Sequence, residues 1–203
     1  MATATGLVWQ ASLFDAAAPA VDGGFDGLVR HRLDPAAWAD HVPGWLDGSD
    51  GLFAVLLDTV PWAQRTRHVR GRPVDEPRLT ASWTVDAAPV DVVRHMAWAL
   101  SDHYRVRFDT VGLQLYRHGR DRVAWHGDRI PEEIRQPKVA LVSLGHPRTL
   151  RLRPVGGGPS RGVVLGRGDL FVMGGTSSRT WQHSVPKVAR AGPRISLAFR
   201  HGA

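Results

Sequence analysis

The second half of the chain alternates between apolar and polar residues with a period of two, which is typical of β-strands. The alternation is clearest in RISLAFR near the C-terminus, and similar runs are separated by Gly, Pro and Asp residues that favour turns. Short successive strands are therefore predicted in five segments: 105–117, 138–145, 149–154, 162–173 and 194–200. The glycine-rich stretch 154–162 is expected to be an exposed hairpin loop.

The first half of the chain carries helical signals instead. Apolar residues within 90–104 recur at a spacing that places them on one stripe, which predicts a helix there. Asp34 followed by Pro35 is typical of a capped helix start and predicts another helix through His41. These patterns predict an α+β protein with N-terminal helices and an all-β second half, either a sandwich or a jelly-roll barrel.

Composition narrows the classes of protein that fit. A chain of 203 residues with 43% hydrophobic content is expected to form one domain, and the absence of cysteine excludes disulfides, thiolate metal sites and cysteine nucleophiles. No apolar run approaches the roughly 20 residues of a membrane span, and the N-terminus lacks the basic region of a signal peptide. We therefore expect a cytoplasmic, monomeric protein without a membrane partner. The formal charge of +7 favours nucleic acid as a partner, although arginine-rich usage can also reflect compositional bias.

The segment VAWHGDRI places a histidine and an aspartate two residues apart in a strand-like run. Side chains two apart in a strand project from the same face, so His126 and Asp128 can converge on one point, with Gly127 between them. Such a pair can hold a divalent metal or form a surface ion pair. His183, in TWQHSVPK, follows another strand-like segment and could join them. Two histidines and one carboxylate form the facial triad that binds non-haem Fe(II).

The C-terminal strand RISLAFR carries two arginines on one face. Alternation puts Arg194, Ser196, Ala198 and Arg200 together, with the apolar residues on the other face. If the arginines point inward, their burial requires an anion such as a dicarboxylate or a nearby carboxylate side chain. The alternative register places both arginines in solvent and the apolar residues in the core.

These segments resemble the AlkB-like Fe(II)- and 2-oxoglutarate-dependent dioxygenases, a family of nucleic-acid alkylation repair enzymes. The resemblance runs from VPWAQRTRHVRGRPVDEPRLTASW to the C-terminus, and its most specific parts are PRLTASW, LQLYRHGRDRVAWHGD, GDLFVMGGTSSRTWQHSVPK and RISLAFR. It implies a double-stranded β-helix (jelly-roll) core with N-terminal helices and a nucleotide-recognition loop region. Residues 1–203 would form a single dioxygenase domain with three parts: an N-terminal extension packed on the barrel (1–60), recognition loops with a support helix (61–105) and the catalytic jelly roll (106–203).

The resemblance also implies the chemistry: oxidative demethylation of N-alkylated nucleobases with Fe(II), 2-oxoglutarate as cosubstrate and O2. The implied partner is alkylated DNA, with single strands as one alternative. The resemblance assigns the iron ligands to His126, Asp128 and His183. It assigns the cosubstrate contacts to Tyr116, Gln114, Arg194, Ser196 and Arg200, with Gln114 standing where the family has asparagine.

Four residues are expected to contact the substrate: Trp83, Arg78, Arg65 and Arg67. Trp83 would hold a base over the iron or be ordinary packing, and the basic segment QRTRHVRGR would contact phosphates or be a solvated loop. Ile130 stands where repair members carry an acidic residue, so the base preference stays open. Two alternatives to DNA demethylation are the same iron chemistry on RNA, protein or a small metabolite, and a non-enzymatic, cupin-like metal-binding barrel.

Overall fold

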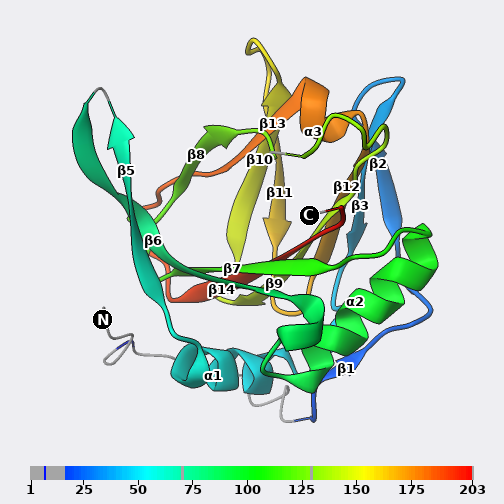
Figure 1. Cartoon of the computed structure of the whole chain (residues 1–203), viewed down its shortest axis with the longest axis vertical. Helices are drawn as coiled ribbons and strands as arrows, with labels where there is room; N and C mark the ends of the chain where they lie inside the picture. Colours follow the sequence, from blue (N-terminus) through cyan, green and yellow to red (C-terminus); the bar gives the residue numbers. More distant parts are fainter. Residues whose placement is uncertain (1–6, 8–16, 70, 129, 203) are drawn as a thin grey trace.

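Two β-sheets face each other, and helices cover the outer side of the larger sheet (Figure 1). The structure is a computed structural model that describes residues 7, 17–69, 71–128 and 130–202. In these ranges the elements are β1 (Ala20–Val21), β2 (Val29–Arg32), β3 (Ala37–Val42), β4 (Leu46–Asp47), α1 (Ser49–Thr59), β5 (Ala63–Val69), β6 (Arg72–Thr84), the 3-10 turn η1 (Val85–Ala87), α2 (Asp91–Tyr104), β7 (Thr110–Tyr116), β8 (Val123–His126), β9 (Val139–Gly145), β10 (Arg148–Pro154), β11 (Arg161–Leu165), β12 (Leu170–Gly175), α3 (Ser177–Thr180), β13 (Trp181–Val185) and β14 (Arg194–Arg200).

Strand order explains how distant segments meet. Among the described residues the larger sheet has the order β2-β3-β12-β9-β14-β7-β6-β5, and the smaller sheet has the order β11-β10-β13-β8. Their neighbouring strands pair antiparallel. This mostly β architecture of two facing sheets agrees with the predicted jelly-roll core.

The central strands of the larger sheet, β9, β12 and β14, are buried on both faces. One hydrophobic cluster lies between this sheet and the helices α1 and α2, and a second lies between the two sheets. On β14, Ile195, Leu197 and Phe199 belong to the helix-side cluster, while Arg194 and Ser196 on the opposite face are also buried. Each of the two alternatives for this strand therefore holds in part. The apolar residues enter a core, as the second alternative expected, and Arg194 points inward, as the first expected.

Several local predictions are confirmed. The helix expected over 90–104 is α2, and its apolar stripe packs into the helix-side cluster. The stretch 154–162 joins the antiparallel strands β10 and β11, as expected of a hairpin loop. In the described part of the chain, no helix is long and apolar enough to cross a membrane.

The helix predicted from Asp34 to His41 is wrong. Asp34 Oδ1 accepts hydrogen bonds from the N–H groups of Ala36 and Ala37, both at 2.8 Å, as a helix cap would. The chain then continues as β3, which pairs with both β2 and β12. Pairing on both sides satisfies the backbone, so tertiary contacts override the local helix signal. The helix of the N-terminal part is instead α1, which the pattern did not predict.

The expected recognition loops are in large part a β-hairpin. Strands β5 and β6 pair antiparallel at the edge of the larger sheet, and their far end projects beyond the other strands at the upper left of Figure 1. Arg65, Arg67 and Arg72 lie on this hairpin, whereas Arg70 and most of the first 16 residues of the expected N-terminal extension lie outside the described residues.

Candidate active site

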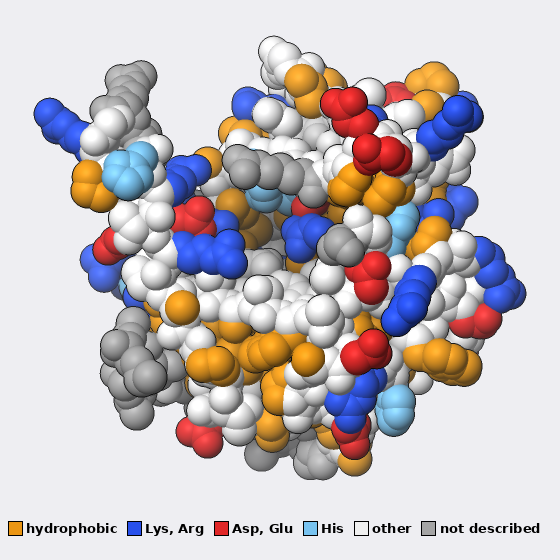
Figure 2. All heavy atoms as spheres, in the orientation of Figure 1, with side chains coloured by type: hydrophobic (Ala, Val, Ile, Leu, Met, Phe, Trp, Pro, Cys, Tyr) orange, Lys and Arg blue, Asp and Glu red, His pale blue; other side chains and the backbone are white. Residues whose placement is uncertain are grey.

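A cavity of about 630 Å³ lies between the two sheets and opens beside the β5–β6 hairpin. Its walls come from β6, β7 and β14 of the larger sheet and from β8 and β13 of the smaller one. In the space-filling view the opening is a hollow with basic side chains on both sides (Figure 2). The volume is within the range of small-molecule sites.

Two strands of the smaller sheet bring the predicted metal ligands together. His126 ends β8 and lies directly opposite His183 of β13, so the two imidazoles project from the same face. Their ring centroids are 4.2 Å apart, and His183 Nε2 lies 3.9 Å from Asp128 Oδ2. The three side chains therefore meet at one end of the cavity.

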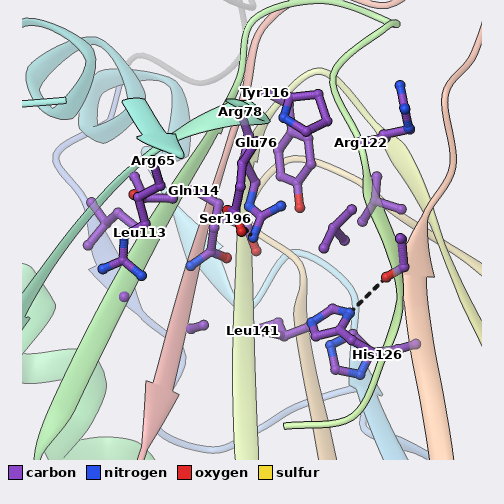
Figure 3. Close-up of a pocket in the computed structure, with 18 of the residues that line it drawn as sticks. Arg65, Glu76, Arg78, Leu113, Gln114, Tyr116, Arg122, His126, Leu141 and Ser196 are labelled. Carbon is purple, nitrogen blue, oxygen red and sulfur yellow. Dashed lines mark hydrogen bonds and ion pairs between the residues drawn. The ribbon is translucent and has the colours of Figure 1, made fainter. Parts of the chain in front are cut away.

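The protonation states suit metal binding. His126 Nδ1 lies 2.9 Å from the carbonyl oxygen of Ala124, which can only accept, so Nδ1 is the donor and Nε2 is the ring nitrogen available to a metal (Figure 3). Burial lowers the pKa of His183 to about 4, against the attraction of Asp128, so its imidazole is neutral at pH 7.

Asp128 is the anionic member of the cluster. Burial disfavours its charged form, but the proximity of His183 and Arg200 outweighs burial and lowers the pKa of this carboxyl. Because His183 is neutral at pH 7, Arg200 is the cation that holds the carboxylate ionised. Arg200 donates from Nε and Nη2 to Oδ1 at 3.1 and 2.7 Å. Asp128 Oδ2 is buried without a hydrogen-bond partner among the described residues, which leaves an acceptor for a cation.

The cluster fits a divalent metal after a small adjustment. Within the described ranges, no three His, Cys, Asp or Glu side chains are already gathered as in a formed metal centre. Ligand atoms at adjacent positions around one octahedral ion lie about 3 Å apart. The 3.9 Å between His183 and Asp128 must therefore shorten by about 1 Å, which side-chain rotation can supply. Two imidazoles and one carboxylate are the donor set of a non-haem Fe(II) site.

A buried guanidinium lies on the adjacent wall. Arg194 is 1% exposed, its Nε donates to Ser143 Oγ at 3.0 Å, and its Nη1 has no acceptor in the part of the chain that the structure describes. Cross-strand pairing places Arg194 opposite Tyr116 and Ser196 opposite Gln114, so these side chains share the cavity face. Burial lowers the pKa of Arg194 to about 10. A cation held in this way fits the distal carboxylate of a dicarboxylate ligand.

A second buried guanidinium, Arg148, lies behind Tyr116. Its Cζ is 5.6 Å from the ring centroid of Tyr116, and that of Arg194 is 5.3 Å from the same centroid. Arg148 donates from Nη2 to the carbonyl oxygens of Asp121 at 2.9 Å and Pro186 at 2.7 Å, and from Nη1 to that of His118 at 3.4 Å. The sequence alone does not single out Arg148, because nothing local distinguishes it from the many surface arginines of the chain.

The residues expected to contact the substrate divide into two groups. Arg65, Arg67 and Arg78 line the cavity. Trp83 does not, because β6 pairs Trp83 with Val111, whose face packs on the helix-side cluster. The placement of Trp83 favours the packing alternative over contact with a base.

The cavity also contains a carboxylate that sequence reasoning missed. Glu76 lies two residues before Arg78 on β6, and its Oε2 is 2.9 Å from Arg78 Nη2. Figure 3 shows both side chains on the cavity side, near Tyr116 and Ser196. The signal that could have revealed it is the strand alternation, continued backward from Thr80 through Arg78.

Facing sheets, a two-histidine and one-carboxylate cluster and an adjacent buried arginine define the class of protein as a metal oxygenase barrel with room for a dicarboxylate. Residues 59–200 match the model of the 2OG-Fe(II) oxygenase superfamily. The chain belongs to this superfamily, which implies Fe(II) as cofactor and 2-oxoglutarate and O2 as cosubstrates.

Curated relatives give a narrower comparison. The chain is 30% identical over 182 residues to "Alpha-ketoglutarate-dependent dioxygenase alkB homolog 3" of Homo sapiens, covering 78% of this chain and 64% of that protein. It is 31% identical over 189 residues to "DNA oxidative demethylase ALKBH2" of Arabidopsis thaliana, covering 73% and 60%. The chain thus spans less than two thirds of the length of these relatives. The match to AlkB-type proteins confirms the family expected from the motifs.

Proposed function

We propose that this protein is an Fe(II)- and 2-oxoglutarate-dependent oxidative demethylase that removes N-methyl groups from nucleobases, with alkylated DNA as its substrate. The observation that carries the proposal is the convergence of His126, Asp128 and His183 in a cavity that also contains the buried Arg194. The printed name of the Arabidopsis relative, a DNA oxidative demethylase, supports the choice of DNA.

His126, Asp128 and His183 would hold the iron. When bound, iron with 2-oxoglutarate and O2 supplies the oxidation that converts an N-methyl group to N–H and formaldehyde, with release of succinate and CO2. The protein would supply the binding site: Arg200 keeps Asp128 ionised, and Arg194 and Tyr116 receive the distal carboxylate of the cosubstrate.

The apolar part of the same cavity would exclude water around the methyl group. Leu141, Leu150, Val185 and Ala198 line it close to the histidines and the arginines. A wall of this kind strengthens the electrostatic contacts to the cosubstrate, because fewer water molecules compete for the same charges.

Arginines at the cavity rim would contact the phosphates. Arg65 and Arg67 are exposed on β5 and line the opening. We expect the double variant Arg65→Gln/Arg67→Gln to bind a single-stranded oligonucleotide less tightly. The slope of log K against log salt concentration should be shallower by about one to two, because fewer counterions are released on binding. The matched control is Arg105→Gln/Arg107→Gln, whose side chains are 79% and 80% exposed beyond the end of α2. Equal losses in the two double variants would contradict a specific role for the rim.

The decisive experiment measures succinate and formaldehyde after O2 is added to protein loaded anaerobically with Fe(II) and 2-oxoglutarate. Oligonucleotides carrying different N-methylated bases are compared with the unmethylated strand. We expect methylated strands to stimulate both products, and His183→Ala to abolish them. The control His146→Ala removes an exposed histidine on the β9–β10 turn and should keep full activity.

The other outcomes also separate the alternatives. Slow succinate formation indifferent to every oligonucleotide would retain the oxygenase but refute the nucleic-acid substrate. Tight metal binding without any dependence on 2-oxoglutarate would support a metal-binding barrel instead. The three-part division of the domain, the monomeric state and the cytoplasmic location stay predictions.

A further inference from the structure

The strand that carries the first of the two histidines in the proposed ligand set has an irregular backbone pairing. β8 is an edge strand of the smaller sheet, and β13 is its partner there (Figure 1). The register pairs His183 with His126, but the next pair lies two residues further along β13 and three residues back along β8. β8 therefore holds one extra residue, which makes a bulge at Ala124–Trp125, immediately before His126.

The bulge controls where the ligands point. A β-bulge re-aims the side chains beside it and leaves the backbone locally unpaired. The direction of His126 toward His183 therefore depends on how firmly the bulge is fixed. Asp128 follows two residues after His126, so a shift of β8 would displace two of the three ligands. On its other side, β13 keeps an unbroken register with residues 151–154 of β10, which makes β10 the firm element from which β8 can be held.

One guanidinium on β10 contacts both ligand strands. Arg153 lies opposite Gln182 of β13 and donates from Nε and Nη2 to Gln182 Oε1 at 3.2 and 3.1 Å. Its Cζ also lies 4.3 Å from the ring centroid of Trp125, in the bulge of β8. Each of these two contacts is made to the residue directly before a histidine of the ligand set. Arg153 therefore joins the two ligand strands behind the metal site.

These contacts lie on the side of the sheet away from the cavity. Leu152 belongs to the cluster between the two sheets, so strand alternation turns Arg153 outward. Among the described residues that line the cavity, Trp125 is included but Arg153 and Gln182 are not. Arg153 can therefore influence the site only through the strands that it joins.

We propose that Arg153 is a positioning residue for the metal site: through Gln182 and Trp125 it fixes the bulge of β8. The bulge in turn sets the approach of His126 to His183. The inference rests on the ligand set of the proposed function and does not depend on its substrate. A guanidinium can stack on an aromatic ring and donate in its own plane to an amide oxygen at the same time, whereas an ammonium group has no such planar fork.

The test measures metal binding without substrate, cosubstrate or turnover. Mn(II) is titrated calorimetrically into the metal-free protein, and the visible absorption of the Co(II)-loaded protein reports the ligand geometry. Arg153→Met keeps the length of the side chain but removes its donors and its charge. We expect this variant to bind Mn(II) on the order of tenfold more weakly than the wild type, with a changed Co(II) spectrum, because outer partners of metal ligands have effects of this size.

The matched control is Arg151→Met, which removes an exposed arginine from the same face of the same strand. Each of the two substitutions removes one positive charge, and that loss alone favours a nearby cation. Weaker Mn(II) binding in Arg153→Met, with unchanged binding in Arg151→Met, would therefore come from lost positioning and not from charge. Arg153→Lys keeps a cation over the ring and should recover part of the affinity.

Coupling between partners gives a second measurement. Gln182→Ala removes the acceptor and should also weaken Mn(II) binding. Added to Arg153→Met it should cause little further loss, because the two residues share one contact. Thermal unfolding of the metal-free variants shows whether each is folded, and Gln182→Ala replaces Arg153→Met in the comparison if the latter does not fold.

Two results would overturn the inference alone. One is a Mn(II) affinity of Arg153→Met within about twofold of the wild type together with an unchanged Co(II) spectrum. The other is an equal loss of affinity in Arg153→Met and Arg151→Met. If the wild type binds no Mn(II), or if His183→Ala binds it as tightly as the wild type, the ligand set of the proposed function fails instead.

Discussion

The substitution Arg194→Met tests whether the buried guanidinium is a cosubstrate site or a structural residue. Burial lowers the pKa of Arg194 from 12.5 to about 10, a difference that corresponds to roughly 3 kcal/mol of unfavourable burial of the charge. Methionine fills a similar volume without charge. We therefore expect the free variant to be at least as stable as the wild type, and at most about 3 kcal/mol more stable, because removing an incompletely compensated buried charge is often neutral or favourable.

The same substitution should remove most of the affinity for 2-oxoglutarate. If the distal carboxylate offsets the burial cost, its loss should weaken binding by about 3 kcal/mol, or on the order of 100-fold. Calorimetric titration of 2-oxoglutarate into the Mn(II)-loaded protein measures the affinity, and urea unfolding of the free protein measures the stability. Arg194→Lys keeps the charge but loses the planar pair of donors, so its affinity for 2-oxoglutarate should lie between those of the wild type and Arg194→Met.

One combination of results would refute this reasoning. If Arg194→Met lowers the free energy of unfolding of the free protein by more than about 1 kcal/mol and changes the affinity for 2-oxoglutarate less than threefold, Arg194 supports the fold and not the cosubstrate.

Three further predictions concern the framework of the site. Burial opposes ionisation of Asp169, but hydrogen bonds from His41 and two backbone N–H groups outweigh it and lower its pKa. Asp169→Asn should therefore cost about 1–3 kcal/mol by urea unfolding above pH 4, and the difference from wild type should vanish as the pH falls below 3.8 through the folded-state pKa; a constant difference would contradict this. Gly174→Ala should lower the thermal midpoint by the equivalent of about 1–3 kcal/mol, because a Cβ at this position would overlap the indole ring of Trp38. An unchanged midpoint would show that the ring can move. Trp83→Leu should lower stability without changing kcat/KM for a methylated oligonucleotide, and a selective loss of kcat/KM would restore its role in base binding.

The strand-borne parts of the site were predictable because they depend on local alternation. Arg194 and Ser196 lie two apart within β14, so they keep one face whatever the rest of the fold does. His126 is the last residue of β8, and Asp128 reaches the same cavity from just beyond the strand. The pairing of His126 with His183 needed the strand order, which only the resemblance to a known family could supply.

The points that the local sequence got wrong or left undecided have a common physical cause, which is long-range pairing of strands. Asp34 makes the hydrogen bonds of a helix cap, yet β12, more than a hundred residues later, draws the following segment into the sheet. For Trp83 the sequence left base contact and packing open, and the register with β7 turns its side chain to the face that packs against the helix-side cluster. Glu76 became visible only when the fold placed it in the cavity with Arg78.

Arg148 has a consequence for the motions of the site. Its guanidinium donates hydrogen bonds to the carbonyl oxygens of His118 and Asp121, which precede His126, and to that of Pro186, which follows His183. The β7–β8 loop and the end of β13 are thus joined behind Tyr116 by one buried side chain. We expect these two segments to open as one cooperative unit, so that their amide hydrogens exchange with solvent at similar free energies of opening. Shortening the side chain of Arg148 should speed amide exchange in both segments together.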